Sequence, residues 1–91
     1  MKTFELRGSA LDWAVAKCEG RTDICLDYST DWSQGGPIIE REGIDTYQSG
    51  VWVAEIGGKH TTEGPTPLIA AMRCFVASRL GDEVNIPEEL Q

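Results

Sequence analysis

The sequence predicts a small α+β fold in which two helices pack on a mainly antiparallel sheet of three to five short strands. Two segments, residues 10–19 and 67–80, carry apolar residues at helical spacing. Several shorter segments alternate apolar and polar residues, as strands do. Strands and helices do not alternate regularly, so a parallel sheet is not indicated. The 91 residues suit a single domain, residues 1–91, with one modest core.

The first predicted strand is "KTFELRG", residues 2–8, because Phe4 and Leu6 fall on one face of an extended chain. A helix at about residues 10–19 follows, with one apolar stripe along it. Ser9 is the expected N-cap, Asp12 reaches back toward it, and a left-handed glycine ends the helix. The residues that delimit this helix are Ser9, Asp12 and Gly20.

The middle of the chain is predicted as strands around one polar segment. "TDICLDY", residues 22–28, alternates apolar and polar residues and leads into the segment 28–36. "PIIER", residues 37–41, is expected to form an edge strand because it begins with proline. The clearest strand lies within residues 50–58, where alternation ends in a Gly57-Gly58 turn.

The strongest local signal is the helix predicted at residues 67–80. Thr66 is a good N-cap, Pro67 suits the first helical position, and Gly81 ends the apolar periodicity. Helical spacing explains the apolar residues of this segment as core packing. A last short strand is expected through Val84 and Ile86.

The charge balance bears on the kind of partner. Fifteen acidic and eight basic residues give a net charge of −7, and no segment gathers the basic residues into a patch. Direct binding of nucleic acid is disfavoured, because such affinity comes from neutralising phosphates. The apolar runs are too short to cross a bilayer, so no membrane partner is expected. An acidic surface favours solubility or a basic protein partner.

The cysteines predict a reduced, cytoplasmic protein without a metal or other cofactor. Cys18, Cys25 and Cys74 are odd in number, form no C-x-x-C pair, and follow no apolar leader. The single histidine, His60, has no sulfur ligand near it in the sequence.

Enzyme motifs are absent from the sequence, and an enzyme is not favoured. The residues around Ser33 lack the first glycine of a G-x-S-x-G elbow. Gly58-Lys59 is not part of a phosphate-binding loop, because the earlier glycine and the following Ser or Thr are missing. The carboxylates Glu40, Glu42 and Asp45 are interpreted as a solvated acidic edge, and a catalytic His60 has no identifiable nucleophile.

The segment 28–36, "YSTDWSQGG", is the predicted ligand-binding site. Its hydroxyls and amides are neutral donors and acceptors, its glycines permit close backbone approach, and its aromatic rings offer flat apolar faces. Arginines outside the segment can supply a phosphate fork. The predicted ligand-binding residues are Tyr28, Ser29, Thr30, Asp31, Trp32, Ser33, Gln34, Gly35, Gly36, Arg41 and Arg73.

A structural interpretation competes with this one. Residues 29–31 can cap a single helical turn, Trp32 can fill the core, and the glycines can turn the chain toward Pro37. Arg73 can be a solvent-exposed helix residue. The sequence leaves both interpretations open.

Four blocks in order carry a resemblance to a known family: "ALDWAVAKCEG" at 10–20, "YSTDWSQGGPIIEREGI" at 28–44, the tryptophan-bearing strand at 51–56, and "GPTPLIAAMRCFVASRLGDEVNIPEEL" at 64–90. Together they resemble the NinX-type small proteins of tailed phages and prophages. The resemblance covers nearly the whole chain. It implies a phage accessory protein that acts in the cytoplasm of the bacterial host.

Three functional hypotheses follow. The first is a non-enzymatic binder that sequesters a nucleotide-type host immune signal, an anti-defence sponge with its pocket between subunits of a homo-oligomer; this rests on analogy with other small phage proteins. The second is an acidic inhibitor of a host enzyme or defence protein. The third is a small hydrolase of such signals that uses Asp31, His60 or the acidic cluster.

Overall fold

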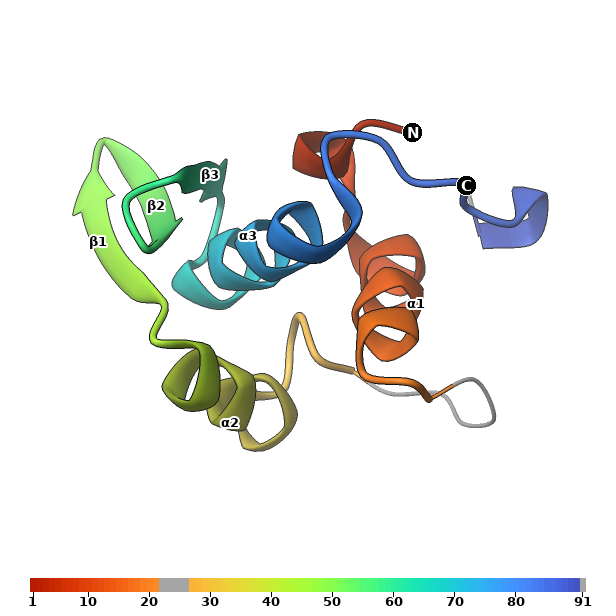
Figure 1. Cartoon of the computed structure of the whole chain (residues 1–91), viewed down its shortest axis with the longest axis horizontal. Coiled ribbons are helices and arrows are strands. Elements are labelled where there is room, and N and C mark those ends of the chain that lie inside the picture. Colours follow the sequence, from red (N-terminus) through yellow and green to blue (C-terminus); the bar gives the residue numbers. More distant parts are fainter. Residues whose placement is uncertain (22–26, 91) are drawn as a thin grey trace.

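The computed structural model describes residues 1–21 and 27–90, and it confirms an α+β fold. Its described residues form three α-helices and one antiparallel sheet of order β1-β2-β3, so the chain has one helix more than the sequence predicts (Figure 1). The elements are η1 Thr3–Glu5, α1 Gly8–Cys18, α2 Trp32–Glu42, β1 Asp45–Ser49, β2 Val51–Ile56, β3 His60–Gly64, α3 Pro67–Leu80 and η2 Glu88–Leu90, where η denotes a 3-10 helix.

Helix α3 is the centre of the fold, and its predicted bounds are confirmed. It contacts all three strands and both other α-helices. The Thr66 hydroxyl caps it by accepting a hydrogen bond from the Ile69 amide at 3.1 Å. Residues on every side of α3 are buried, not only those of one stripe, because it has neighbours all round. The buried residues are Leu68, Ala70, Ala71, Met72, Cys74, Phe75, Val76 and Ala77.

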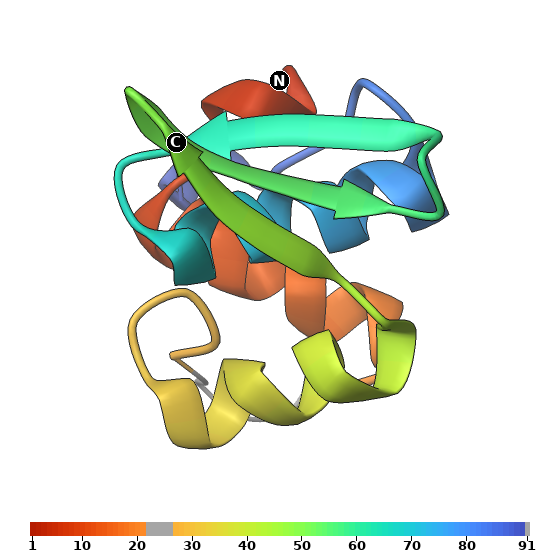
Figure 2. The ribbon, with the colours of Figure 1, turned by 90° about the vertical axis from the view of Figure 1, so that its left-hand side faces the viewer.

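The sheet covers one side of α3 (Figure 2). The predicted strand at 50–58 is confirmed as β2, and its turn after Ile56 contains Gly57 and Gly58. Strands β1 and β3 are additional to those assigned from the sequence. Gly64 lets β3 approach α3 closely, because a Cβ there would lie 2.7 Å from the Ala70 amide nitrogen.

Helix α1 begins earlier than predicted and is not capped by Ser9. The residue before its first turn is Arg7, whose side chain makes no capping hydrogen bond. The Asp12 carboxylate turns away from the helix end and accepts from the Ser29 amide at 2.8 Å. The predicted capping box is therefore wrong, because Asp12 ties α1 to the chain before α2. Gly20 takes the expected left-handed conformation, with φ of 74°.

The prediction of an edge strand at residues 37–41 is wrong, because these residues belong to helix α2. The Gly35-Gly36-Pro37 run argues against a helix on propensity alone. Burial of the Ile38 side chain, 2% exposed, and the close packing of Gly35 offset that cost. The strand predicted at residues 22–28 lies mostly outside the described residues, and Tyr28 at its end lies in a turn.

The predicted strands at the two ends of the chain, at residues 2–8 and through Val84 and Ile86, are also wrong. The ends form an isolated antiparallel bridge between Lys2 and Glu83 in place of paired strands. The chain then enters η1, which leaves Phe4 60% exposed and Leu6 fully buried. These two residues do not share a face, because a 3-10 turn rather than an extended chain separates them.

Candidate functional site

The first half of the predicted binding segment, residues 28–31, belongs mainly to the framework. The side chains of Tyr28 and Ser29 are buried, and burial raises the pKa of the Tyr28 phenol. Asp31 is the N-cap of α2: its carboxylate accepts from the Ser33 amide at 2.9 Å and from the Ser33 hydroxyl at 2.6 Å. These hydrogen bonds lower the pKa of Asp31. Thr30 is exposed in the turn before the cap.

The second half, residues 32–36, is the start of α2. The Gln34 side chain bridges two parts of the turn, accepting from the Asp27 amide at 2.9 Å and donating to Asp31 at 3.0 Å. Gly35 is a packing residue, since a Cβ there would lie 2.4 Å from the Tyr28 carbonyl oxygen and 2.6 Å from a Leu68 methyl group. The polar groups of this segment therefore largely serve its own turn.

Trp32 is 54% exposed at the first position of α2, so the structural alternative that places it in the core is wrong. Its ring lies within 4 Å of the position that a Cβ on Gly36 would take. Its role in binding stays a prediction.

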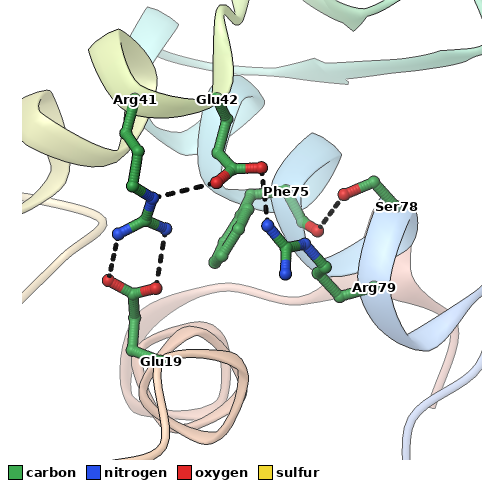
Figure 3. Close-up of polar contacts among 6 residues, drawn as sticks. All are labelled: Glu19, Arg41, Glu42, Phe75, Ser78 and Arg79. Carbon is green, nitrogen blue, oxygen red and sulfur yellow. Dashed lines mark hydrogen bonds and ion pairs between the residues drawn. The ribbon is translucent and has the colours of Figure 1, made fainter.

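Arg41 is held in an ion-pair cluster that joins the three helices (Figure 3). Its guanidinium donates to both carboxylate oxygens of Glu19, at 2.9 and 2.7 Å, and to Glu42 at 2.9 Å. Glu42 also accepts from Arg79 at 2.7 Å. Both guanidiniums lie near the ring of buried Phe75, with centroid distances of 5.7 Å for Arg41 and 5.2 Å for Arg79.

The electrostatics of this cluster, named here the helix-junction cluster, are balanced. It comprises Glu19, Arg41, Glu42 and Arg79, with Phe75 beneath the guanidiniums. Hydrogen bonds that Glu42 accepts from Arg79 and Arg41 lower the pKa of Glu42, the Arg79 bond having the larger effect. The hydrogen bonds that Arg41 donates to Glu19 and to Glu42 raise the pKa of Arg41, the Glu19 bonds having the larger effect. Arg41 is predicted to bind a ligand phosphate, but its guanidinium already pairs with the carboxylates of Glu19 and Glu42.

The structure gathers three predicted residues in one small hollow of about 210 Å³. Tyr28, Gln34 and Arg41 line it, together with Glu19, Arg21, Pro37 and Ile38. Trp32 and Arg73 are not among its lining residues. A volume of this size falls below the several hundred Å³ typical of small-molecule sites.

Arg73 lies in a different part of the molecule from Arg41. Its guanidinium donates to two backbone carbonyls, from Nε to Leu6 at 2.7 Å and from Nη1 to Glu63 at 2.8 Å. Burial and the charge of Arg7 lower the pKa of Arg73. It is half-buried, so the interpretation of Arg73 as a fully solvent-exposed helix residue is wrong.

Arg73 lines two neighbouring hollows. The first, named here the arginine cavity, has a volume of about 460 Å³ and is lined by Met1, Glu5, Arg7, Ala10, Arg73 and Leu90. The second, the Phe4 groove, has about 680 Å³ and is lined by Phe4, Val51, Thr61, Glu63, Gly64, Pro65 and Arg73. Sequence reasoning missed Arg7, because only the fold brings the residue before α1 next to a residue of α3.

The outer face of the sheet carries exposed apolar side chains among carboxylates. Strand register places Asp45 opposite Glu55, and places Tyr47 and Glu63 on either side of Val53. Tyr47 and Val51 are 44% and 46% exposed, and the Tyr47 hydroxyl donates to Glu55 at 3.1 Å. This outer sheet face is defined by Asp45, Tyr47, Val51, Val53, Glu55 and Glu63. No described helix lies in front of it (Figure 2).

The residues considered for catalysis are not assembled around a common centre. Asp31 caps α2, Glu42 pairs with two arginines, and His60 begins β3, where its carbonyl accepts from the buried Cys74 thiol at 3.2 Å. Burial raises the pKa of Cys18 and of Cys74 to about 11 each, which disfavours the nucleophilic thiolate. Within residues 1–21 and 27–90, no group of three or more His, Cys, Asp and Glu residues can hold a metal ion.

Comparison with known families shows the family of the chain. The family model described as bacteriophage P22 NinX matches residues 20–79. The chain belongs to the NinX family. The match spans the predicted binding segment, the sheet and nearly all of α3, and so includes the helix-junction cluster except Glu19.

No curated protein matches the chain. In the part of this NinX-type phage protein that the structure describes, no helix combines the length and the apolar character needed to cross a membrane.

Proposed function

We propose that this NinX-type phage protein acts by binding, and that the outer sheet face docks on a basic surface of a host protein. The observation that carries the proposal is the composition of that face. Its three carboxylates, Asp45, Glu55 and Glu63, come from three different strands, and the residues of β1, β2 and β3 include no lysine or arginine. A negative potential of this kind attracts a basic partner and orients its approach.

Burial of the exposed apolar side chains of this face against a partner is energetically favourable. Tyr47 and Val51 remain 44% and 46% exposed. The other residues of β2 are buried or half-buried. A tyrosine supplies a large contact area with a polar end, which suits the centre of an interface. A second copy of this chain is a poor occupant, because the same carboxylates would face one another.

Capture from host lysate with matched charge variants tests the proposal. Glu55→Lys combined with Glu63→Lys reverses two charges on the outer sheet face. Glu88→Lys combined with Glu89→Lys makes the same change in net charge at exposed residues of η2. The wild type and the η2 variant are expected to retain one stoichiometric partner at low salt and to release it at high salt. A partner that the sheet variant retains equally, or no partner for the wild type, contradicts the proposal.

Sequestration of a nucleotide-type signal at the predicted segment is the second candidate function. The observation that favours it is the hollow shared by Tyr28, Gln34 and Arg41, which Arg21 extends with an exposed cation. Binding there requires a ligand phosphate to compete with Glu19 and Glu42 for Arg41. Titration calorimetry with a nucleotide panel tests it: Arg41→Gln should abolish the heat of binding. Light scattering of the same samples measures the predicted homo-oligomer.

A further inference from the structure

The arginine cavity is lined by two arginine side chains that form no ion pair with a described carboxylate. Apart from the two bonds that the Arg73 guanidinium gives to backbone carbonyls, neither the Arg73 nor the Arg7 side chain makes a hydrogen bond or ion pair to a described residue. Both line the same hollow of about 460 Å³. Two guanidiniums facing one space in a protein of net charge −7 repel each other and gain from an anion between them.

We propose that the arginine cavity and the Phe4 groove form one site for a nucleotide-type ligand, with the phosphate on Arg7 and Arg73 and the ring on Phe4. This inference does not rest on docking by the outer sheet face, although the Phe4 groove shares Val51 and Glu63 with that face. It shares its ligand class with the second candidate function but places the ligand at a different site.

The chemistry of the cavity suits a phosphate group. A guanidinium presents a planar fork of donors that matches two phosphate oxygens, and Arg73 is already oriented by its bonds to Leu6 and Glu63. Ala10, in the first turn of α1, lines the same cavity, so the positive end of the helix dipole adds to the two arginines.

The neighbouring groove suits a planar ring. Arg73 lines both hollows, so a ligand bound to it can extend from one into the other. Phe4 is 60% exposed in the groove and offers an aromatic face for stacking, and Val51 and Pro65 add apolar surface. A phosphate alone would leave this groove empty.

Two acidic residues line the combined site, Glu5 in the arginine cavity and Glu63 in the Phe4 groove, and Glu5 is the one on the phosphate side. Glu5 lines the arginine cavity, and its charge reduces the local positive potential. Removing that charge by Glu5→Gln should tighten the binding of a phosphorylated ligand several-fold. The same change should leave an uncharged ligand unaffected.

Titration calorimetry on the full chain, at low salt, tests the site with adenosine 5′-monophosphate, adenosine and inorganic phosphate as probes. The monophosphate is expected to bind at least tenfold more tightly than either of the others. Arg7→Ala should weaken its binding about tenfold, as should Arg73→Met. Phe4→Ala should weaken the monophosphate severalfold and leave inorganic phosphate unchanged.

The control is Arg41→Gln, which removes a guanidinium that two carboxylates already hold, and which should leave the affinity unchanged. Because Arg73→Met also removes two internal hydrogen bonds, Arg7→Ala at an exposed position is the deciding variant. No saturable binding of the monophosphate, or equal affinity in Arg7→Ala, overturns the site. Equal affinity in Phe4→Ala overturns the ring position. Loss of binding in Arg41→Gln assigns the ligand to the hollow lined by Tyr28, Gln34 and Arg41.

Discussion

Two groups of arginines, each with one member on helix α3, differ in whether a carboxylate neutralises their charge. In the helix-junction cluster, Arg41 and Arg79 each reach a carboxylate at 2.7 Å. In the arginine cavity, Arg73 meets only backbone carbonyls, and Arg7 makes no ion pair to a described residue. A guanidinium that a carboxylate holds contributes to structure, because a ligand must displace that carboxylate first. One without such a partner keeps its charge for a ligand.

Phe75→Ala should have the largest effect, because it breaks the helix-junction cluster from below. The fully buried ring lies beneath both guanidiniums and inside the core. Truncating a buried phenylalanine costs about 3–5 kcal/mol in the free energy of unfolding. Urea denaturation measures the loss. Phe4→Ala, at a 60% exposed ring, is the matched control and should change stability by less than about 0.5 kcal/mol. Equal losses would contradict the burial described here.

Comparing Arg73→Met with Arg7→Met shows which arginine of the arginine cavity contributes to stability and which does not. Arg73 donates to the carbonyls of Leu6 and Glu63, and its loss leaves both without that donor. The expected cost is about 1–3 kcal/mol in the free energy of unfolding. Arg7→Met should leave stability nearly unchanged. Thermal denaturation of the two variants makes the comparison, and a costly Arg7→Met would show that its charge is also structural.

A double-mutant cycle of Arg41→Gln and Glu19→Gln measures the strongest ion pair of the helix-junction cluster. The pair is bidentate, and the Glu19 side chain is only 18% exposed, but the Arg41 side chain is 49% exposed. The coupling energy should therefore be near the upper end for surface pairs, about 1 kcal/mol, and should fall with added salt. The same cycle on the more exposed Lys2–Glu83 pair should give a smaller value. A larger value there would contradict the ranking by burial.

Glu42→Gln should have the smallest effect, a loss of stability that is present at neutral pH and disappears in acid. Two guanidiniums lower the folded-state pKa of Glu42 below its ordinary 4.5. Its contribution is therefore fully present above about pH 4.5 and is lost as the pH falls through the folded-state value. The variant should lose stability less steeply below that pH than the wild type. Glu40→Gln, an exposed residue of the same helix, serves as control and should follow the wild-type curve.

The sequence was sufficient wherever a segment's own pattern decides its structure. Helix α3 carries a capping threonine, a proline at its first position and dense apolar residues, and β2 alternates clearly before a glycine pair. The four blocks of sequence were also enough to indicate the family. Helix α2 was not accessible in this way, because its glycines and proline favour a loop and its stability comes from Ile38 and the contact of Gly35 with Leu68.

The candidate sites depended more strongly on the fold. The sequence offered the hydroxyls, amides and arginines of residues 28–36, 41 and 73, but it could not show which of their groups are already hydrogen-bonded. Asp31 and Gln34 bond within their own turn, and Glu19 reaches Arg41 from the C-cap of α1. By itself, the sequence determined the fold class, the central helix, the acidic charge and the family. Only the tertiary structure decided which charges are neutralised, because ion pairs form between residues that are distant in the chain and adjacent in space.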